Sequence, residues 1–165
     1  MLNKALPVAL ALAVAGLLLF SPTAFAGSTS TNLNVSANVL AWCTINADPV
    51  NFGDYAGNSA TVPLNVYVLC SETVPYAVAM DAGQNYTSTW RHMTDGASLL
   101  RYVLLRPGGG EWNDAGYGDT YCCGTPVGGT GSGGTQTLAG SAFVFGGYAV
   151  TPGAYADVVV VSVNW

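Results

Sequence analysis

The chain has 165 residues, of which 50% are hydrophobic and only 8% are charged. Its formal net charge of −5 arises from 4 basic and 9 acidic residues, and the basic residues form no cluster. Nucleic acids and anionic membrane surfaces are bound through such clusters, so we expect neither as a partner. The abundance of Gly and aromatic residues is unlike that of a disordered chain or a helical bundle, and it favours a single all-β domain.

The N-terminus has the pattern of an export signal. Lys4 precedes an unbroken small and apolar run, residues 5–20, and Ala24-Phe25-Ala26 has the form of a signal-peptidase site. We predict a signal peptide over residues 1–26 and export through the periplasm into an oxidising compartment, where disulfides form. An uncleaved membrane anchor is the alternative, but the apolar run is shorter than the ~20 residues that span a bilayer.

Beyond residue 26, apolar and polar residues alternate, and Gly, Pro or Asn separates the runs. This period of two predicts β-strands, and their spacing predicts a sandwich of antiparallel sheets. Pro63 indicates an edge position or a bulge in its strand. The candidate strands behind the N-terminal region are residues 60–69, 76–80, 99–105, 135–138, 142–145 and 156–165.

The clearest alternation lies directly behind the export signal. The odd positions of residues 33–41 are apolar or small, and the positions between them are polar except for Leu40. Such a segment can be the first strand of its own sandwich or a strand that leaves its own domain.

A glycine-rich region, residues 107–134, interrupts the strand pattern. It predicts one insertion that forms a long exposed loop or a loose hairpin. Asn113, Asp114 and Asp119 lack the spacing of a calcium loop and are interpreted as an ordinary polar loop tip. Cys122-Cys123 lacks the C-x₂-C spacing of a zinc site, so disulfide use is the favoured interpretation and no metal is expected.

The sequence contains no strong pattern of catalytic residues. His92 is the sole histidine, it has Asp95 nearby, and no G-x-S-x-G motif accompanies it. Lys4 is removed with the signal, which leaves the mature chain without a lysine for Schiff-base or general-base chemistry. We therefore interpret His92 as a solvated turn residue and expect neither enzymatic activity nor a cofactor.

Several short motifs carry a family resemblance through their shared order. They are Trp42-Cys43-Thr44-Ile45 after the alternating segment, Asn51-Phe52-Gly53, Val68-Leu69-Cys70-Ser71, and the ending G-x-Y-x-D-x-V-x-V-x-V from Gly153 with the terminal aromatic Trp165. In this the chain resembles the spore coat protein U family, which includes subunits of archaic chaperone-usher pili. The resemblance covers nearly all of the mature chain, and the glycine-rich insertion departs from it.

The resemblance implies an immunoglobulin-like antiparallel β-sandwich that lacks its last strand. Residues 42–165 would form this pilin domain, and residues 27–41 would form a donor strand that completes the sandwich of a neighbouring subunit. The donor side chains would be Leu33, Val35, Ala37 and Val39. Identical subunits, a periplasmic chaperone and an outer-membrane usher would be the partners, and Trp165 would be the C-terminal anchor for the chaperone.

The resemblance also pairs Cys43 with Cys70. It says nothing of Cys122 and Cys123, which we expect to bond to each other, with a cross-link between neighbouring subunits as the alternative.

The C-terminal run supports the same interpretation, because residues 158–165 are almost continuously apolar and no later strand follows to cover their edge. The predicted function is a structural subunit of a surface pilus with a role in adhesion or biofilm. One alternative is a non-fibrous spore-coat or envelope protein of the same fold. The other is a carbohydrate-binding tip adhesin that uses loop aromatics, namely Trp90, Trp112, Tyr117 and Tyr121.

Overall fold

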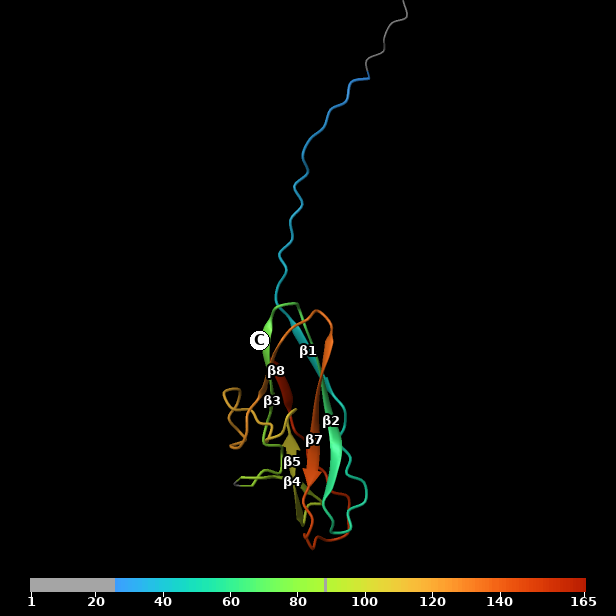
Figure 1. Cartoon of the computed structure of the whole chain (residues 1–165), viewed down its shortest axis with the longest axis vertical. Coiled ribbons are helices and arrows are strands. Elements are labelled where there is room, and N and C mark those ends of the chain that lie inside the picture. The colour runs from blue at the N-terminus through green and yellow to red at the C-terminus, as the bar shows by residue number, and fades with distance from the viewer. Residues whose placement is uncertain (1–25, 88) are drawn as a thin grey trace, which may run out of the picture. The chain divides into compact units, whose positions relative to one another are not determined.

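The computed structural model of the chain describes residues 26–87 and 89–165 (Figure 1). It divides into two compact units, residues 1–38 and residues 39–165. In the first unit the described residues, 26–38, are exposed and belong to no helix or strand. The predicted signal peptide lies outside the described residues except for Ala26. The described part of the chain holds no helix long and apolar enough to cross a membrane.

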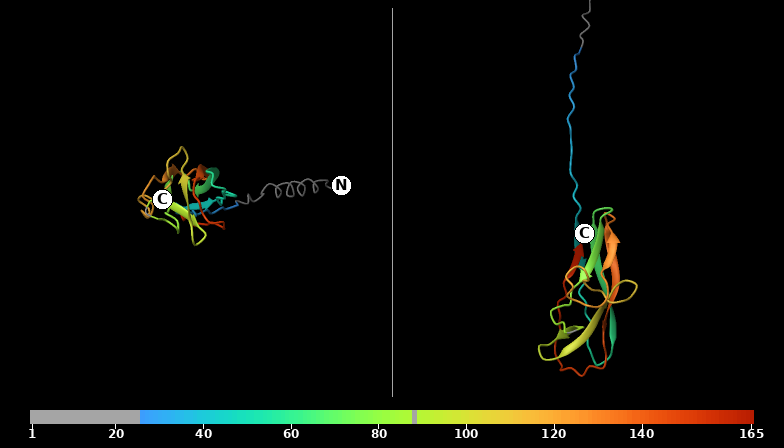
Figure 2. Two further views of the ribbon diagram at one scale, coloured as in Figure 1. Left: turned by 90° about the horizontal axis from the view of Figure 1, so that it is seen from below. Right: turned by 90° about the vertical axis from the view of Figure 1, so that its left-hand side faces the viewer.

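The second unit is a sandwich of two antiparallel sheets, as the strand pattern predicts (Figures 1 and 2). The larger sheet has five strands in the order β1-β2-β7-β5-β4. Their bounds are Cys43–Ala47 for β1, Ala60–Cys70 for β2, Thr135–Val144 for β7, Leu99–Leu105 for β5 and Arg91–Thr94 for β4.

The smaller sheet has three strands in the order β6-β3-β8. Their bounds are Val127–Thr130 for β6, Pro75–Met80 for β3 and Val161–Asn164 for β8. The inward-facing residues of both sheets form one core, because alternate side chains of a strand point to the same face. Its fully buried members include Val66, Val68, Val78, Met80 and Trp112.

Two predicted runs of the sequence join into one strand, β7, which passes through Gly140. A side chain at Gly140 would collide with the carbonyl oxygen of Leu105, so this close approach of β5 requires glycine. Pro63 lies in β2 beyond the point where β1 ends, since the last β1 residue, Ala47, faces Val66. The predicted edge position of Pro63 is thus confirmed on that side of β2.

The sequence pattern does not reveal the short strands β4 and β6. β6 is Val-Gly-Gly-Thr, and its register with β3 places Gly129 opposite Tyr76. The ring of Tyr76 occupies the space that a side chain at Gly129 would need. β6 is therefore defined by its backbone pairing with β3 and by the close contact of Gly129 with the Tyr76 ring. It has no alternation of apolar and polar residues that the sequence pattern could show.

The predicted strand over residues 156–165 is too long, because only Val161–Asn164 forms β8. Residues before it bond irregularly, with Ala156 paired to Thr94 in an isolated bridge. A continuous apolar run is typical of a strand buried on both faces, but Val158 and Val160 are 55% and 59% exposed in the isolated chain.

The prediction of an exposed loop over residues 107–134 holds for residues 115–120, which are exposed, but is wrong for residues 112–114 and for Tyr121, which are buried. Trp112 is fully buried, and its indole N–H donates to the carbonyl of Val78 at 2.8 Å. The carboxylate of Asp114 accepts from the backbone N–H of Thr120 at 2.9 Å and from that of Tyr121 at 2.9 Å. Large aromatic groups and local hydrogen bonds therefore give the insertion a defined conformation.

Candidate functional site: an open sheet edge and its groove

The smaller sheet ends in an open edge at β8. Within the described chain β8 pairs with β3 alone, and β1 is the corresponding outer strand of the larger sheet. β1 and β8 contact each other, and the sandwich opens between β8 and the residues that follow β1. An unpaired strand edge beside a hydrophobic core is a typical acceptor for an additional strand.

The backbone of β8 shows which groups are unpaired. Asp81 donates its N–H to the carbonyl of Val160 at 3.1 Å, and the register then places Ser162 opposite Ala79. Successive peptide groups of a strand point to opposite edges. The N–H and C=O groups of Val161 and Val163 therefore face the open side.

A hollow of about 420 Å³ lies along this edge and reaches the core. Its floor is apolar and is formed by residues of four different strands, Leu64, Met80, Met93, Tyr102 and Leu104. Val159 and Val161 line one wall, and Ala47, Val50 and Phe52 line the other. The geometry suits an extended segment that places alternate apolar side chains inward.

Asp157 holds the C-terminal wall of the groove in place. One carboxylate oxygen accepts hydrogen bonds from the backbone N–H groups of Gln84 at 3.0 Å and Asn85 at 3.1 Å. The other accepts from the hydroxyl of Tyr102 at 2.6 Å. Burial and this bond to Asp157 raise the pKa of Tyr102 well above its ordinary value. A side chain at Gly83 would collide with the same carboxylate, so the turn needs glycine there.

Arg91 fastens the insertion beneath the groove floor. This fully buried guanidinium donates to the carbonyls of Met80 and Trp112, each at 2.9 Å, and lies 3.9 Å from the ring centre of Tyr121. Burial lowers the pKa of Arg91. Three carbonyl acceptors, with Asp81 as the third, stabilise the charge in place of a carboxylate partner.

The predicted donor side chains are exposed. Leu33, Val35 and Val39 are 85%, 86% and 85% exposed, and Ala37 is exposed too. Residues 27–42 belong to no strand of the described chain. Their role as donors stays a prediction.

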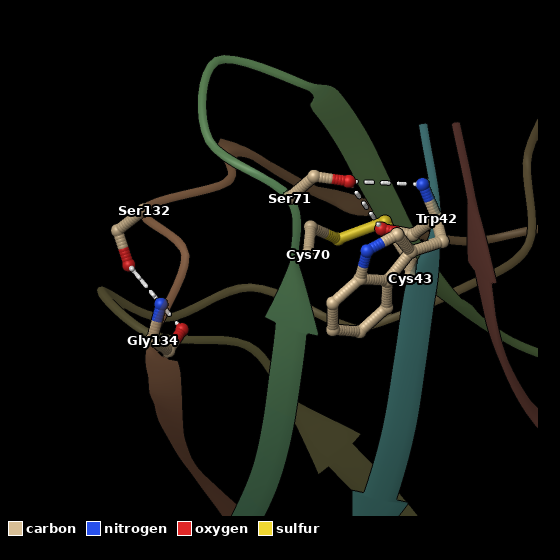
Figure 3. The surroundings of a disulfide bond; sticks show 6 residues. All are labelled: Trp42, Cys43, Cys70, Ser71, Ser132 and Gly134. Carbon is tan, nitrogen blue, oxygen red and sulfur yellow. Dashed lines mark hydrogen bonds between the residues drawn. A yellow bond between two sulfur atoms is a disulfide. The ribbon is translucent and has the colours of Figure 1, made fainter. Parts of the chain in front are cut away.

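The disulfide between Cys43 and Cys70 is confirmed. It joins facing residues of β1 and β2 where the N-terminal region enters the domain (Figure 3). Ser71 accepts from the N–H of Trp42 at 3.0 Å and donates its hydroxyl to the carbonyl of Trp42 at 3.2 Å. Trp165 follows β8 directly and is exposed, and its role as a chaperone anchor stays a prediction.

The remaining cysteines differ from expectation. Cys122 is exposed, Cys123 is half-buried, and both are free thiols in the structure, so the expected vicinal disulfide is not formed there. A hydrogen bond with Cys122 and partial burial raise the pKa of Cys123 to about 11.

His92 is not the solvated turn residue that the sequence suggests. It is buried in β4, and its Nδ1 lies 3.0 Å from the hydroxyl of Thr87. Asn113 and Asp114 are buried as well, so they do not form an exposed polar tip. Across residues 26–87 and 89–165 no three His, Cys, Asp or Glu side chains gather as a metal site.

The aromatic residues proposed for a tip adhesin separate into two groups. Trp112 and Tyr121 are buried and cannot serve as stacking platforms, whereas Tyr117 is exposed. The ring of Trp90 is covered by the guanidinium of Arg101, 3.1 Å from the ring centre.

Sequence reasoning missed the residues that build the groove. Arg91 and Tyr102 face each other in consecutive strands, and Asp157, which reaches Tyr102 from 55 positions away, joins them only in the folded domain. Asp157 is a polar residue within an apolar run, and this was the available signal that it has a structural partner.

A family comparison confirms the resemblance that the sequence motifs indicate. A family model described as the Spore Coat Protein U domain matches residues 29–162. No curated protein shows significant sequence similarity to the chain.

Two solved structures share the fold. One is from the CsuC-CsuE chaperone-tip adhesion subunit pre-assembly complex of the archaic chaperone-usher Csu pili of Acinetobacter baumannii, with a TM-score of 0.58 and 22% identity. The match covers 77% of this chain and 40% of that chain, so this protein spans less than half of its length. The other is a chaperone-usher pilus, with a TM-score of 0.51 and 20% identity over 88% of this chain and 99% of that chain.

Proposed function

Because this chain belongs to the Spore Coat Protein U domain family, we propose that it is a structural subunit of an archaic chaperone-usher surface pilus. The observation that carries the proposal is the open edge of β8 above an apolar hollow. The exposed alternating segment of the same chain supplies the complementary pattern. Residues 27–41 of one copy act as the donor strand, and residues 42–165 of the next copy act as the acceptor.

Burial of the donor side chains provides the binding energy. At ~1.5 to 3 kcal/mol for each fully buried Leu or Val, Leu33, Val35 and Val39 contribute roughly 5 to 9 kcal/mol. Ala37 fills a shallow position, and hydrogen bonds to the open edge of β8 add to the total. Such a joint dissociates very slowly.

The donor and acceptor surfaces of one subunit are different, so the contact is heterologous. Contacts of this kind propagate as an open fibre unless their rotation closes a ring. A homopolymeric rod on the cell surface follows, with a role in adhesion or biofilm and without catalysis or a cofactor.

Assembly requires a transient partner for the open groove. A periplasmic chaperone would cover β8 and anchor the exposed Trp165 before an outer-membrane usher directs polymerisation. The expected export signal at residues 1–26 fits this route.

The test places a charge at the largest predicted donor residue. Leu33→Asp would bury an unpaired carboxylate in the groove of the neighbour and should abolish polymerisation of the exported protein. Asn34→Asp is the matched control, because its side chain has the opposite phase of the strand and stays in solvent. Size-exclusion chromatography should give a ladder of oligomers for the wild type and the control.

The acceptor function is tested separately with a synthetic peptide of residues 27–41. Purified Leu33→Asp subunit should bind this wild-type peptide, since its own groove is intact. Fibres of Leu33→Asp at the normal level would contradict the proposal. A wild-type protein that stays monomeric would favour the non-fibrous coat or envelope protein.

A further inference from the structure

The disulfide between Cys43 and Cys70 lies where the N-terminal segment joins the domain. In the proposed fibre, residues 27–41 of each copy lie in the groove of the neighbour. The peptide bond from Trp42 to Cys43 is then the covalent connection between this donor segment and its own domain. Tension along the fibre therefore enters each subunit at Cys43.

β1 is by itself a weak anchor for this tension. It has five residues, none of them fully buried, and within the described part of the larger sheet it pairs with β2 alone. The N–H of Trp42 donates to the hydroxyl of Ser71 at 3.0 Å, and the carbonyl of Trp42 accepts from the N–H of Ser71 at 3.0 Å. Single hydrogen bonds of this kind contribute little net stability, because water replaces the lost partner.

A displaced β1 would also open the groove. Ala47 is the last residue of β1, Val50 and Phe52 follow it in the chain, and all three line the wall opposite β8. In the proposed fibre, the donor strand of the next copy is held between this wall and β8. Tension that pulled β1 away from β2 would withdraw the wall and release that donor strand, so failure at one joint would spread to the next.

The disulfide gives tension a path that avoids β1. Cys43 is the first residue of β1 and faces Cys70, the last residue of β2. A pull on Cys43 is therefore transmitted to Cys70 through the bridge before it loads the rest of β1. β2 is the stronger anchor, because it lies inside the sheet and ten of its eleven residues pair with β7.

The chain that follows Cys70 is firmly held. The carbonyl of Cys70 accepts from the N–H of Gly133 at 3.1 Å, and the N–H of Thr73 donates to the carbonyl of Gly131 at 2.9 Å. A side chain at Gly131 would collide with the carbonyl oxygen of Ser71, so this close approach requires glycine. Figure 3 shows the bridge and the two strands that it joins. The receiving end of the bridge is thus fastened to the loop that precedes β7.

From this end of β2 the path continues to the open edge. β3 begins at Pro75 and pairs with β8, from Ala77 opposite Asn164 to Met80 opposite Val161. The open edge of β8 is the proposed binding site of the next donor strand. The two joints of one subunit are therefore connected through the bridge, the end of β2, β3 and β8, without β1 or the groove wall that follows it.

We propose that the disulfide carries the tension of the fibre past β1, and thereby keeps a load on one joint from opening the groove at the next. This inference rests on the proposed function and adds a mechanical role to it. The same bridge also restricts the unfolded chain, a stabilising effect that needs no load.

The experiment applies force to single fibres of the full-length exported protein in dithiothreitol. This reductant cleaves a disulfide by attack of its thiolate on one sulfur, with the other sulfur as the leaving thiolate. Cys43 is only partly buried, so the reductant can reach the bridge. Force assists the separation of two sulfurs that bear tension, so cleavage, measured as the time to rupture, should become several-fold faster as the load increases.

Two variants extend the comparison. Fibres of Cys43→Ala with Cys70→Ala should rupture several-fold faster than the wild type under load, and the difference should be smaller without load. Cys122→Ala with Cys123→Ala is the matched control, because it removes two sulfurs from the insertion, and it should rupture like the wild type at every load. If the bridge variant does not fold, the measurement in reductant decides, since it starts from folded wild-type fibres.

The outcomes separate the two proposals. Wild-type protein that forms no polymer overturns the proposed function. Cleavage at a rate that is independent of load overturns this inference alone. Reduction that accelerates rupture equally with and without load also overturns it, because the bridge would then stabilise the subunit without carrying tension.

Discussion

The hydroxyl of Tyr102 donates a 2.6 Å hydrogen bond to the carboxylate of Asp157, across 55 positions of sequence. Tyr102 lies in β5 on the floor of the groove, and Asp157 lies in the segment that forms its wall. The bond therefore ties the wall to the core in the subunit without a donor strand. The floor and this wall of the groove are therefore already connected before assembly.

Loss of this bond should destabilise the subunit. Tyr102→Phe leaves the partly buried carboxylate with one donor fewer, and a hydrogen bond to a charged group is worth about 1.5 to 3 kcal/mol. We expect the free energy of unfolding in urea to fall by roughly this amount. Tyr67→Phe removes a similar bond to Asp48 on the exposed surface, where water replaces the lost partner, and should have a smaller effect. If the two substitutions lowered the free energy of unfolding equally, the bond between Tyr102 and Asp157 would contribute no more to stability than an exposed one.

Alkaline pH should destabilise the fold through two buried tyrosines. Burial raises the pKa of Tyr102 and of Tyr121, with bonds to Asp157 and Glu111 as further causes. The folded state thus favours the protonated phenols, whose stabilisation is complete below pH about 10 and is lost as pH rises above it. Unfolding measured between pH 8 and 11 should show this decline, and Tyr102→Phe should flatten it. An unchanged slope in the variant would contradict the assignment.

The end of β8 should be needed before assembly. Deletion of Asn164 and Trp165 removes the pairing of Asn164 with Ala77 and the predicted chaperone anchor. We expect the periplasmic level of the subunit to fall through degradation or aggregation, as measured by immunoblot of periplasmic extracts. Undiminished soluble monomer in cells that lack the chaperone would indicate a self-complete domain.

The two free thiols should react at different rates. Cys122 is exposed, whereas the pKa of Cys123 is raised to about 11, which keeps it protonated near neutral pH. Since the thiolate is the nucleophile, iodoacetamide should label Cys122 first, and peptide mapping should recover Cys43 bonded to Cys70. Protein in which neither thiol reacts before reduction would instead contain the vicinal disulfide, and reducible SDS-resistant dimers would indicate a cross-link between subunits.

Much of the sheet content could be predicted from the sequence alone. In β2 one face is buried, and the alternation of Leu64, Val66 and Val68 follows this burial directly. The motifs around Cys43 and Cys70 carried the family resemblance and with it the disulfide. These patterns are local, because the polarity of each residue indicates whether its side of the strand is buried or exposed.

Only the tertiary structure decided the rest. The burial of His92, the buried charge of Arg91 and the ordered insertion around Trp112 depend on partners that come from distant strands. The same holds for the groove, since the strand order leaves one edge of β8 unpaired beside the groove that Tyr102 and Asp157 line. The period of apolar residues identifies which face of a strand is buried, but it does not identify the neighbouring strand. The open edge depends on the order of strands in the sheet, and so it could not be predicted from the period.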